Sequence, residues 1–140
     1  MKKYLITMLA LMLGASSLFA QEEVKAPYLF SDLEGIWVAT ASYDPVTNRR
    51  KAFEGTLAIG FTNLAAGSKR FCILRVGEEA TRCVYAITGS TITLYHAIQR
   101  DIPIVKFNIV SMYQGFEMYG LIKICDTTEE GLNVVFSYTE

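Results

Sequence analysis

Hydrophobic and polar residues alternate in twos along most of the chain after residue 34, which is the pattern of half-buried β-strands. β-Branched and aromatic residues are enriched in these runs, and Gly, Asn, Asp and Glu gather at the breaks between them. The pattern predicts strands over 35–43, 50–61, 69–76, 81–87, 91–98, 103–113, 116–125 and 132–139.

The links between these predicted strands are short. Short links join antiparallel neighbours, because a parallel pair needs a crossover of about a dozen residues or more. Eight such strands in an up-and-down meander fold into a sandwich or close into a barrel. We predict an all-β fold with a single eight-stranded antiparallel barrel, whose interior is filled by side chains or holds one small ligand.

Alternation also indicates the inward face. The predicted inward residues are Phe53, Leu57, Ile59, Phe61, Ile92, Leu94, Leu132, Val134, Phe136 and Tyr138. A ligand is expected at an open barrel end rimmed by loops, with the apolar-tipped loop 62–69 as a lid or contact surface. The candidate ligand-binding residues are Trp37, Phe53, Leu94, His96, Phe136 and Tyr138.

The N-terminus has the three parts of a secretory signal. Two lysines precede an apolar run that stops at Gly14, and small residues follow up to Ala20. The apolar run is well short of the roughly 20 residues that a membrane-spanning helix needs. We predict an exported protein, periplasmic or secreted, without stable membrane insertion, and divided into a signal peptide at 1–20, an N-terminal segment at 21–34 and a barrel domain at 35–140.

Charge narrows the choice of partners. The chain has 13 Lys and Arg against 14 Asp and Glu, a formal charge of −1, which becomes −3 without the two lysines of the signal. Nucleic-acid binding requires a concentrated basic face, so this balance argues against it. The one basic run, 49–51, follows the turn-like "DPVTN" and is expected at a solvated hairpin tip.

Gly35 stands two residues before Trp37, the only tryptophan. The glycine allows a tight bend into the first strand, and the indole can close one barrel end beneath the core. The preceding "PYLFSDLEG" predicts a short helical turn over that end, capped by Ser31 or Asp32.

This Gly-x-Trp at the start of a meander resembles the lipocalins and the wider calycin group, including small lipocalin-like domains of exported bacterial proteins. The resemblance implies a binding protein that holds a small apolar ligand in the barrel or a protein partner through its loops. Lipocalins carry a late arginine that packs across the tryptophan, whereas no arginine follows Arg100 here.

The early "GIW" and the hairpin "KRFCILRVGEEATRCVYAI" also resemble the staphostatins, secreted barrels that inhibit papain-like cysteine peptidases. This resemblance implies a peptidase as partner and a rigid loop that presents a glycine in a substrate-like pose. Gly115 and Gly131 are the candidates for that inhibitory loop. The alternative is that each glycine only permits a tight turn.

The same hairpin brings two of the three cysteines together. A two-residue turn at Gly77-Glu78 places Cys72 opposite Cys83, within disulfide range, and export permits oxidation. Counting from that turn places the pair at a hydrogen-bonded position, where a bridge is strained. Bridged and free cysteines therefore both stay open, and Cys125 is left as a buried apolar residue or an unpaired thiol.

Catalytic and metal-binding motifs are not evident. His96 is the only histidine and shares a face with Ile92 and Leu94, so it is expected in the core or at the barrel mouth. The sequence contains no nucleophile elbow, Cys-x-x-Cys, His-Glu-x-x-His or phosphate-binding loop. We predict a non-enzymatic protein without a catalytic residue, cofactor or metal ion.

Overall fold

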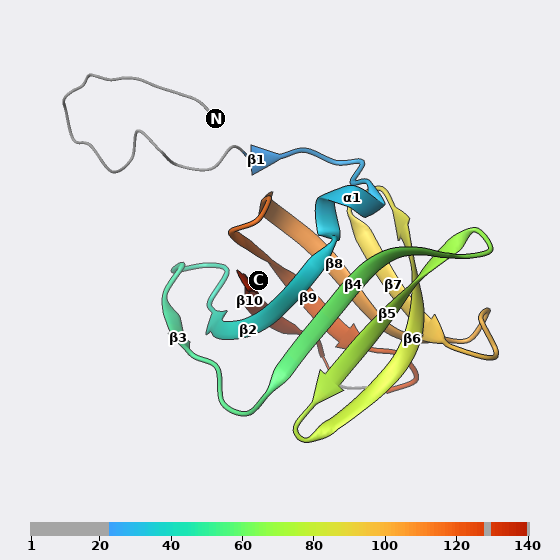
Figure 1. The fold of residues 1–140 in the computed structure, drawn as a ribbon. Coiled ribbons are helices and arrows are strands. Elements are labelled where there is room, and N and C mark those ends of the chain that lie inside the picture. The colour runs from blue at the N-terminus through green and yellow to red at the C-terminus, as the bar shows by residue number, and fades with distance from the viewer. Residues whose placement is uncertain (1–22, 128–129, 140) are drawn as a thin grey trace.

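The chain forms a closed β-barrel with a short helix at one end (Figure 1). This structure, a computed structural model, describes residues 23–127 and 130–139. The predicted signal peptide lies outside the described residues. The elements are β1 Glu23–Val24, α1 Phe30–Leu33, β2 Gly35–Tyr43, β3 Arg50–Ala52, β4 Leu57–Ala66, β5 Lys69–Val76, β6 Glu79–Thr88, β7 Thr91–His96, β8 Pro103–Tyr113, β9 Glu117–Ile124 and β10 Leu132–Thr139.

The predicted eight-stranded antiparallel barrel is confirmed. Its strands follow the order β2-β4-β5-β6-β7-β8-β9-β10, and β10 pairs back onto β2 to close the ring. Each pair of neighbours is antiparallel, as the short links predict. The strands β1 and β3 lie outside the ring, where β1 pairs with β8 and β3 pairs with β2. No helix in the described part of the chain is long and apolar enough to cross a membrane.

Alternating side chains fill the middle of the barrel. Phe107 and Phe136 are fully buried and meet edge to face, with ring centroids 5.2 Å apart. The predicted inward face is confirmed for the following buried residues: Ile59, Phe61, Ile92, Leu94, Val134 and Phe136. Leu57 and Phe53 are only partly buried against this core, and Leu132 is 44% exposed, because all three lie near one end of the barrel.

The other end is closed by α1 and Trp37, as predicted (Figure 1). The fully buried indole donates a hydrogen bond from Nε1 to the Leu33 carbonyl oxygen over 2.7 Å. Tyr138 packs edge to face against it, with centroids 5.2 Å apart. The indole thus ties the helical turn to the first strand and fills the space beneath it.

The cap of α1 differs in detail from the prediction. The residue at the N-cap position is Leu29, whose backbone N–H donates to the Asp32 carboxylate over 2.8 Å. Asp32 therefore caps from inside the first turn, and Ser31 supplies no cap. The Ser31 carbonyl instead accepts a hydrogen bond from the Gln114 side chain, which fastens the turn to the β8–β9 hairpin.

The predicted strand 50–61 is wrong as one element. It divides into β3 and β4 around 53–56, where Gly55 has a φ of +95°. The predicted loop 62–69 is also wrong, because β4 continues to Ala66 and only Gly67 and Ser68 form the turn to β5. A bulge between Phe61 and Ala65 keeps this extension paired with β5, and it runs away from the open end, so it forms no lid there.

Candidate functional site

A cavity of about 510 Å³ opens at the barrel end opposite α1. Its wall comes from strand ends that meet there: the start of β4, the end of β5, the start of β8, the end of β9 and the start of β10. Pockets for small molecules typically measure about 300–1,000 Å³ and are mostly apolar. The apolar lining residues are Phe53, Leu57, Leu74, Val76, Ile104, Val105, Ile122, Ile124 and Leu132.

The cavity exists because the interior side chains change in size along the barrel. In the middle, Phe107 packs against Phe136 and Phe61 packs against Tyr85, and all four rings are buried. At the open end the inward positions carry Leu, Val and Ile, which are too short to reach the opposite wall of an eight-stranded barrel. The aliphatic layer therefore forms the wall of the cavity, and the buried aromatic layer fills the middle of the barrel.

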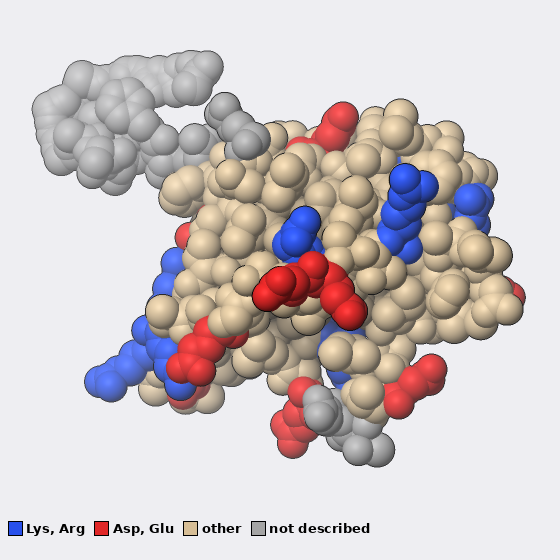
Figure 2. Space-filling view, turned by 60° about the horizontal axis from the view of Figure 1, so that its bottom comes forward, with Lys and Arg blue, Asp and Glu red and all other residues tan. Residues whose placement is uncertain are grey.

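Polar side chains lie at the rim. Glu54 and Thr56 come from the link between β3 and β4, and Thr127 and Glu130 come from the link between β9 and β10. Lys123, near the end of β9, is also a lining residue. Figure 2, in which the open end is turned forward, shows Asp and Glu side chains on this face together with Lys and Arg side chains. Apolar walls with a few polar groups at the opening are suited to an amphiphilic guest.

Most of the predicted ligand residues lie elsewhere. Phe53 lines the cavity, as expected of it. Trp37 and Tyr138 pack at the closed end, and Leu94 and Phe136 are buried in the filled middle. The alternation identified inward-facing positions, but it did not distinguish positions at the open end from those in the filled core.

His96 is exposed at the end of β7, so of its two expected places, in the core or at the barrel mouth, the core is wrong. A register shift after Leu94 in the β7–β8 pairing changes how the last residues of the strand are placed. The backbone N–H of His96 donates to the Ile102 carbonyl over 3.0 Å. The imidazole is thus absent from the residues that line the cavity.

Cys72 and Cys83 face each other across β5 and β6, as the two-residue turn predicts. Val76 pairs with Glu79, which confirms that turn. Both cysteines are buried and free. A hydrogen bond between the two thiols, together with burial, raises the pKa of the Cys72 thiol well above its ordinary value. This cysteine therefore stays protonated and weakly nucleophilic at neutral pH.

Alkylation is expected to distinguish the three cysteines by their exposure to solvent. In the native protein at about pH 8, iodoacetamide should modify the half-buried Cys125 first, whereas Cys72 and Cys83, 2% and 0% exposed, react only after denaturation. Peptide mass spectrometry measures the modification at each site. Peptides of Cys72 and Cys83 that are modified only after reduction would instead select the bridged alternative.

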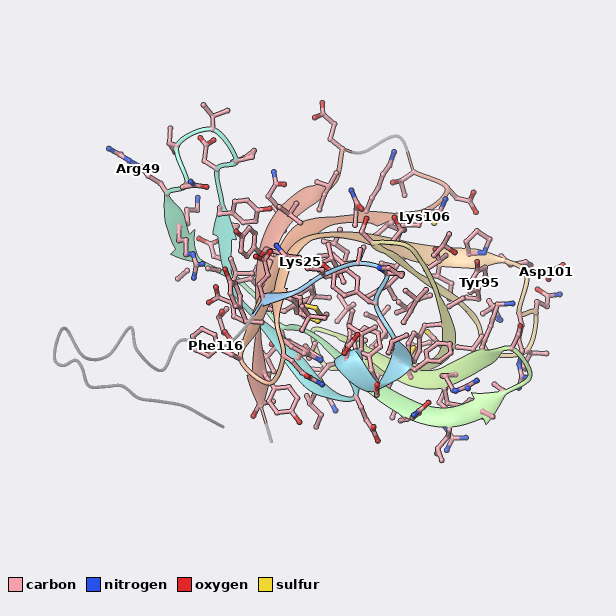
Figure 3. The ribbon with its side chains drawn as sticks, turned by 90° about the horizontal axis from the view of Figure 1, so that it is seen from above. Lys25, Arg49, Tyr95, Asp101, Lys106 and Phe116 are labelled. Carbon is pink, nitrogen blue, oxygen red and sulfur yellow. The ribbon has the colours of Figure 1, made fainter. Side chains whose placement is uncertain are left out.

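The two candidate inhibitory glycines have structural explanations. Gly115 has a φ of +72° in the β8–β9 hairpin, where the Phe116 N–H donates to the Tyr113 carbonyl over 3.0 Å. Figure 3 shows Phe116 at the outer margin of the barrel. A side chain at Gly131 would press on the backbone oxygen of Ile122, 2.7 Å from the added Cβ. Turn geometry explains the first glycine and close packing explains the second.

A second, smaller hollow of about 250 Å³ lies on the outer wall. The link after β2 and the strand β3 fold back over this wall, where Arg50 forms a bidentate ion pair with Glu117 at 3.1 and 2.8 Å. The hollow is lined mainly by polar atoms, and Arg50 already has its carboxylate partner. Its lining residues are Tyr43, Asn48, Arg50, Tyr119 and Val135.

Within the described ranges, no group of three or more His, Cys, Asp or Glu side chains is arranged to hold a metal ion. Comparison of the chain with protein-family models, with curated proteins and with solved structures gives no match. The arguments for a function therefore come from the cavity and its surroundings.

Proposed function

We propose that the protein binds a small, predominantly apolar molecule in the cavity at the open end of the barrel, without catalysing a reaction. The observation that carries this proposal is an apolar-lined space of about 510 Å³ at one end of a barrel whose other end is closed by α1 and Trp37. A filled barrel would leave no such space. Burial against these walls contributes about 0.8 kcal/mol for each methylene group of a ligand.

The sequence resemblance supports the same proposal. Gly35 and Trp37 lie at the closed end of an eight-stranded up-and-down barrel, as in the lipocalin-like proteins that the sequence resembles. The signal-like residues 1–20 fit an exported carrier, periplasmic or secreted. The proposed protein would thus carry its ligand outside the cytoplasm.

A fluorescence titration with the neutral apolar dye N-phenyl-1-naphthylamine tests the proposal. We expect saturable binding with one site for each chain. The variant Val76→Trp should weaken binding by about tenfold or more, roughly 1.4 kcal/mol, because it places an indole in the cavity mouth. The matched control is Val110→Trp, at a 62% exposed valine of β8, and it should bind like the unmodified protein. Absence of dye binding, or equal loss in both variants, would contradict the proposal.

Inhibition of a papain-like peptidase is the alternative, and it has its own assay. The hydrogen-bonded turn at Gly115 is folded back on itself, whereas a substrate-like loop is extended, so the geometry favours ligand binding. Stoichiometric inhibition of papain that is lost in Gly115→Arg or Gly131→Arg would select the inhibitor. No inhibition across several peptidases of this class would remove the alternative.

A further inference from the structure

The hairpin turns at the two ends of the barrel differ in charge, while α1 and the residue after it place Asp32 and Glu34 at the closed end. The turns at the closed end, 67–68, 89–90 and 114–116, contain no charged residue. The links at the open end, within the described ranges, carry carboxylates at Glu54, Glu78, Asp126 and Glu130. The β7–β8 link is the mixed case, with Arg100 and Asp101 side by side.

Two cations near the open end start from the outer wall, although Lys123 is also among the residues that line the cavity. Lys123 lies between the inward-facing Ile122 and Ile124 and pairs with Lys106. Because side chains alternate between the two faces of a strand, the Lys123 side chain leaves the backbone on the outer surface. Figure 3 labels Lys106 on the same strand pair. The Arg100 guanidinium lies 5.4 Å from the centre of the Phe71 ring, on the outer face of β5. Among the residues that line the cavity, two carboxylates, Glu54 and Glu130, thus stand against one cation, Lys123.

The two carboxylates that line the cavity form no ion pair among the described residues. Among the described residues the ion pairs are Lys25 with Glu23 and Arg50 with Glu117, and neither includes Glu54 or Glu130. Beside them lies Phe53, whose ring also lines the mouth. Carboxylates and an aromatic face are the groups that bind an ammonium ion in proteins.

We infer that the ligand is a cationic amphiphile, with an aliphatic chain in the cavity and an alkylammonium head at the rim. This inference rests on the proposed function and adds the charge of the ligand. The aliphatic wall accepts the chain, while Glu54, Glu130 and the ring of Phe53 face the head. A carboxylate head would meet the same two carboxylates against one lysine, Lys123, and would on balance be repelled. Because the rim is open to water, the selectivity should be modest and should fall as salt is added.

Calorimetry with three amphiphiles of equal chain length tests the charge of the ligand. The probes are dodecyltrimethylammonium, dodecyl maltoside and dodecanoate, each below its micelle concentration at low ionic strength. We expect the cationic probe to bind most tightly and the anionic probe most weakly, with a ratio of about fivefold to tenfold between them. Shortening the cationic chain should weaken binding by about fourfold for each methylene removed.

Single charge-neutralising variants locate the effect. Glu54→Gln and Glu130→Gln should each reduce the preference for the cationic probe by about twofold to threefold. The matched control Glu34→Gln removes the same charge from an exposed residue at the closed end and should leave the preference unchanged. Equal loss in all three variants would overturn the inference, because the effect would then come from net charge.

The outcomes separate this inference from the proposed function. Equal affinity for the three probes, or a preference for dodecanoate, overturns the cationic ligand while saturable dye binding preserves the cavity as a site. Failure of both the dye and the probes to bind overturns both proposals. Binding of the cationic probe that persists in Val76→Trp would also overturn the inference, since it would show adsorption outside the cavity.

Discussion

Replacing Trp37 by alanine is expected to reduce the free energy of unfolding by about 4 kcal/mol. Removing a fully buried aromatic side chain typically costs about 3–5 kcal/mol, because the surrounding residues relax only partly into the space left behind. The substitution also leaves the Leu33 carbonyl without the 2.7 Å hydrogen bond from the indole. Because Trp37 is the only tryptophan, far-UV circular dichroism in a denaturant titration is the measurement.

Two further variants serve as comparisons for Trp37→Ala. Trp37→Phe keeps a ring in place but removes the donor, so we expect a smaller loss of about 2 kcal/mol. Leu29→Ala, at a residue 61% exposed in the same segment, should change stability by less than about 0.5 kcal/mol. A loss below about 1 kcal/mol in Trp37→Ala would show that the closed end does not depend on the indole.

Gly35→Ala is expected to be about as damaging, at roughly 4 kcal/mol. Gly35 has a φ of +128°, a conformation that residues with a side chain rarely adopt and that costs them about 1–3 kcal/mol. A Cβ at this position would also overlap the ring of Tyr138, and overpacking of this kind adds about 1–3 kcal/mol. Thermal and chemical unfolding of the variant measure the combined loss.

Gly67→Ala is the matched control for Gly35→Ala. Gly67 also has a positive φ, +67°, but an added Cβ there meets no atom within 4 Å. It should therefore show only the backbone cost, about 1–2 kcal/mol. In a Tyr138→Ala background the cost of Gly35→Ala should fall toward that value, which measures the coupling between the two residues. An unchanged cost in that background would show that the ring is not the obstacle.

The barrel was predictable because the alternation of hydrophobic and polar residues along a strand indicates which side chains face inward. The buried Ile59, Ile92 and Val134 all occupy positions that the pattern assigns to the interior. Errors arise where the strand departs from regular pairing. The bulge between Phe61 and Ala65 allows β4 to run on through Leu64, although the apolar and small residues there do not alternate.

The cavity was only partly predictable, for a geometric reason. Phe53, Leu57 and Leu132 are inward residues in the sequence pattern, and each lines the cavity. Whether an inward residue fills the core or borders empty space depends on the side chains across the barrel, which come from distant parts of the chain. A search for inward Leu, Val and Ile at strand ends opposite Trp37 would have found Leu74 and Val105 as well.

The two strands outside the ring bear on how the molecule behaves at high concentration. Closure gives each strand of the ring a neighbour on both sides, so within the described residues the strands with a single neighbour are β1 and β3. These are two and three residues long, and both carry charged side chains: Glu23 in β1, Arg50 and Lys51 in β3. Short, charged borders resist edge-to-edge joining of sheets, so aggregation through strand addition between intact molecules is disfavoured.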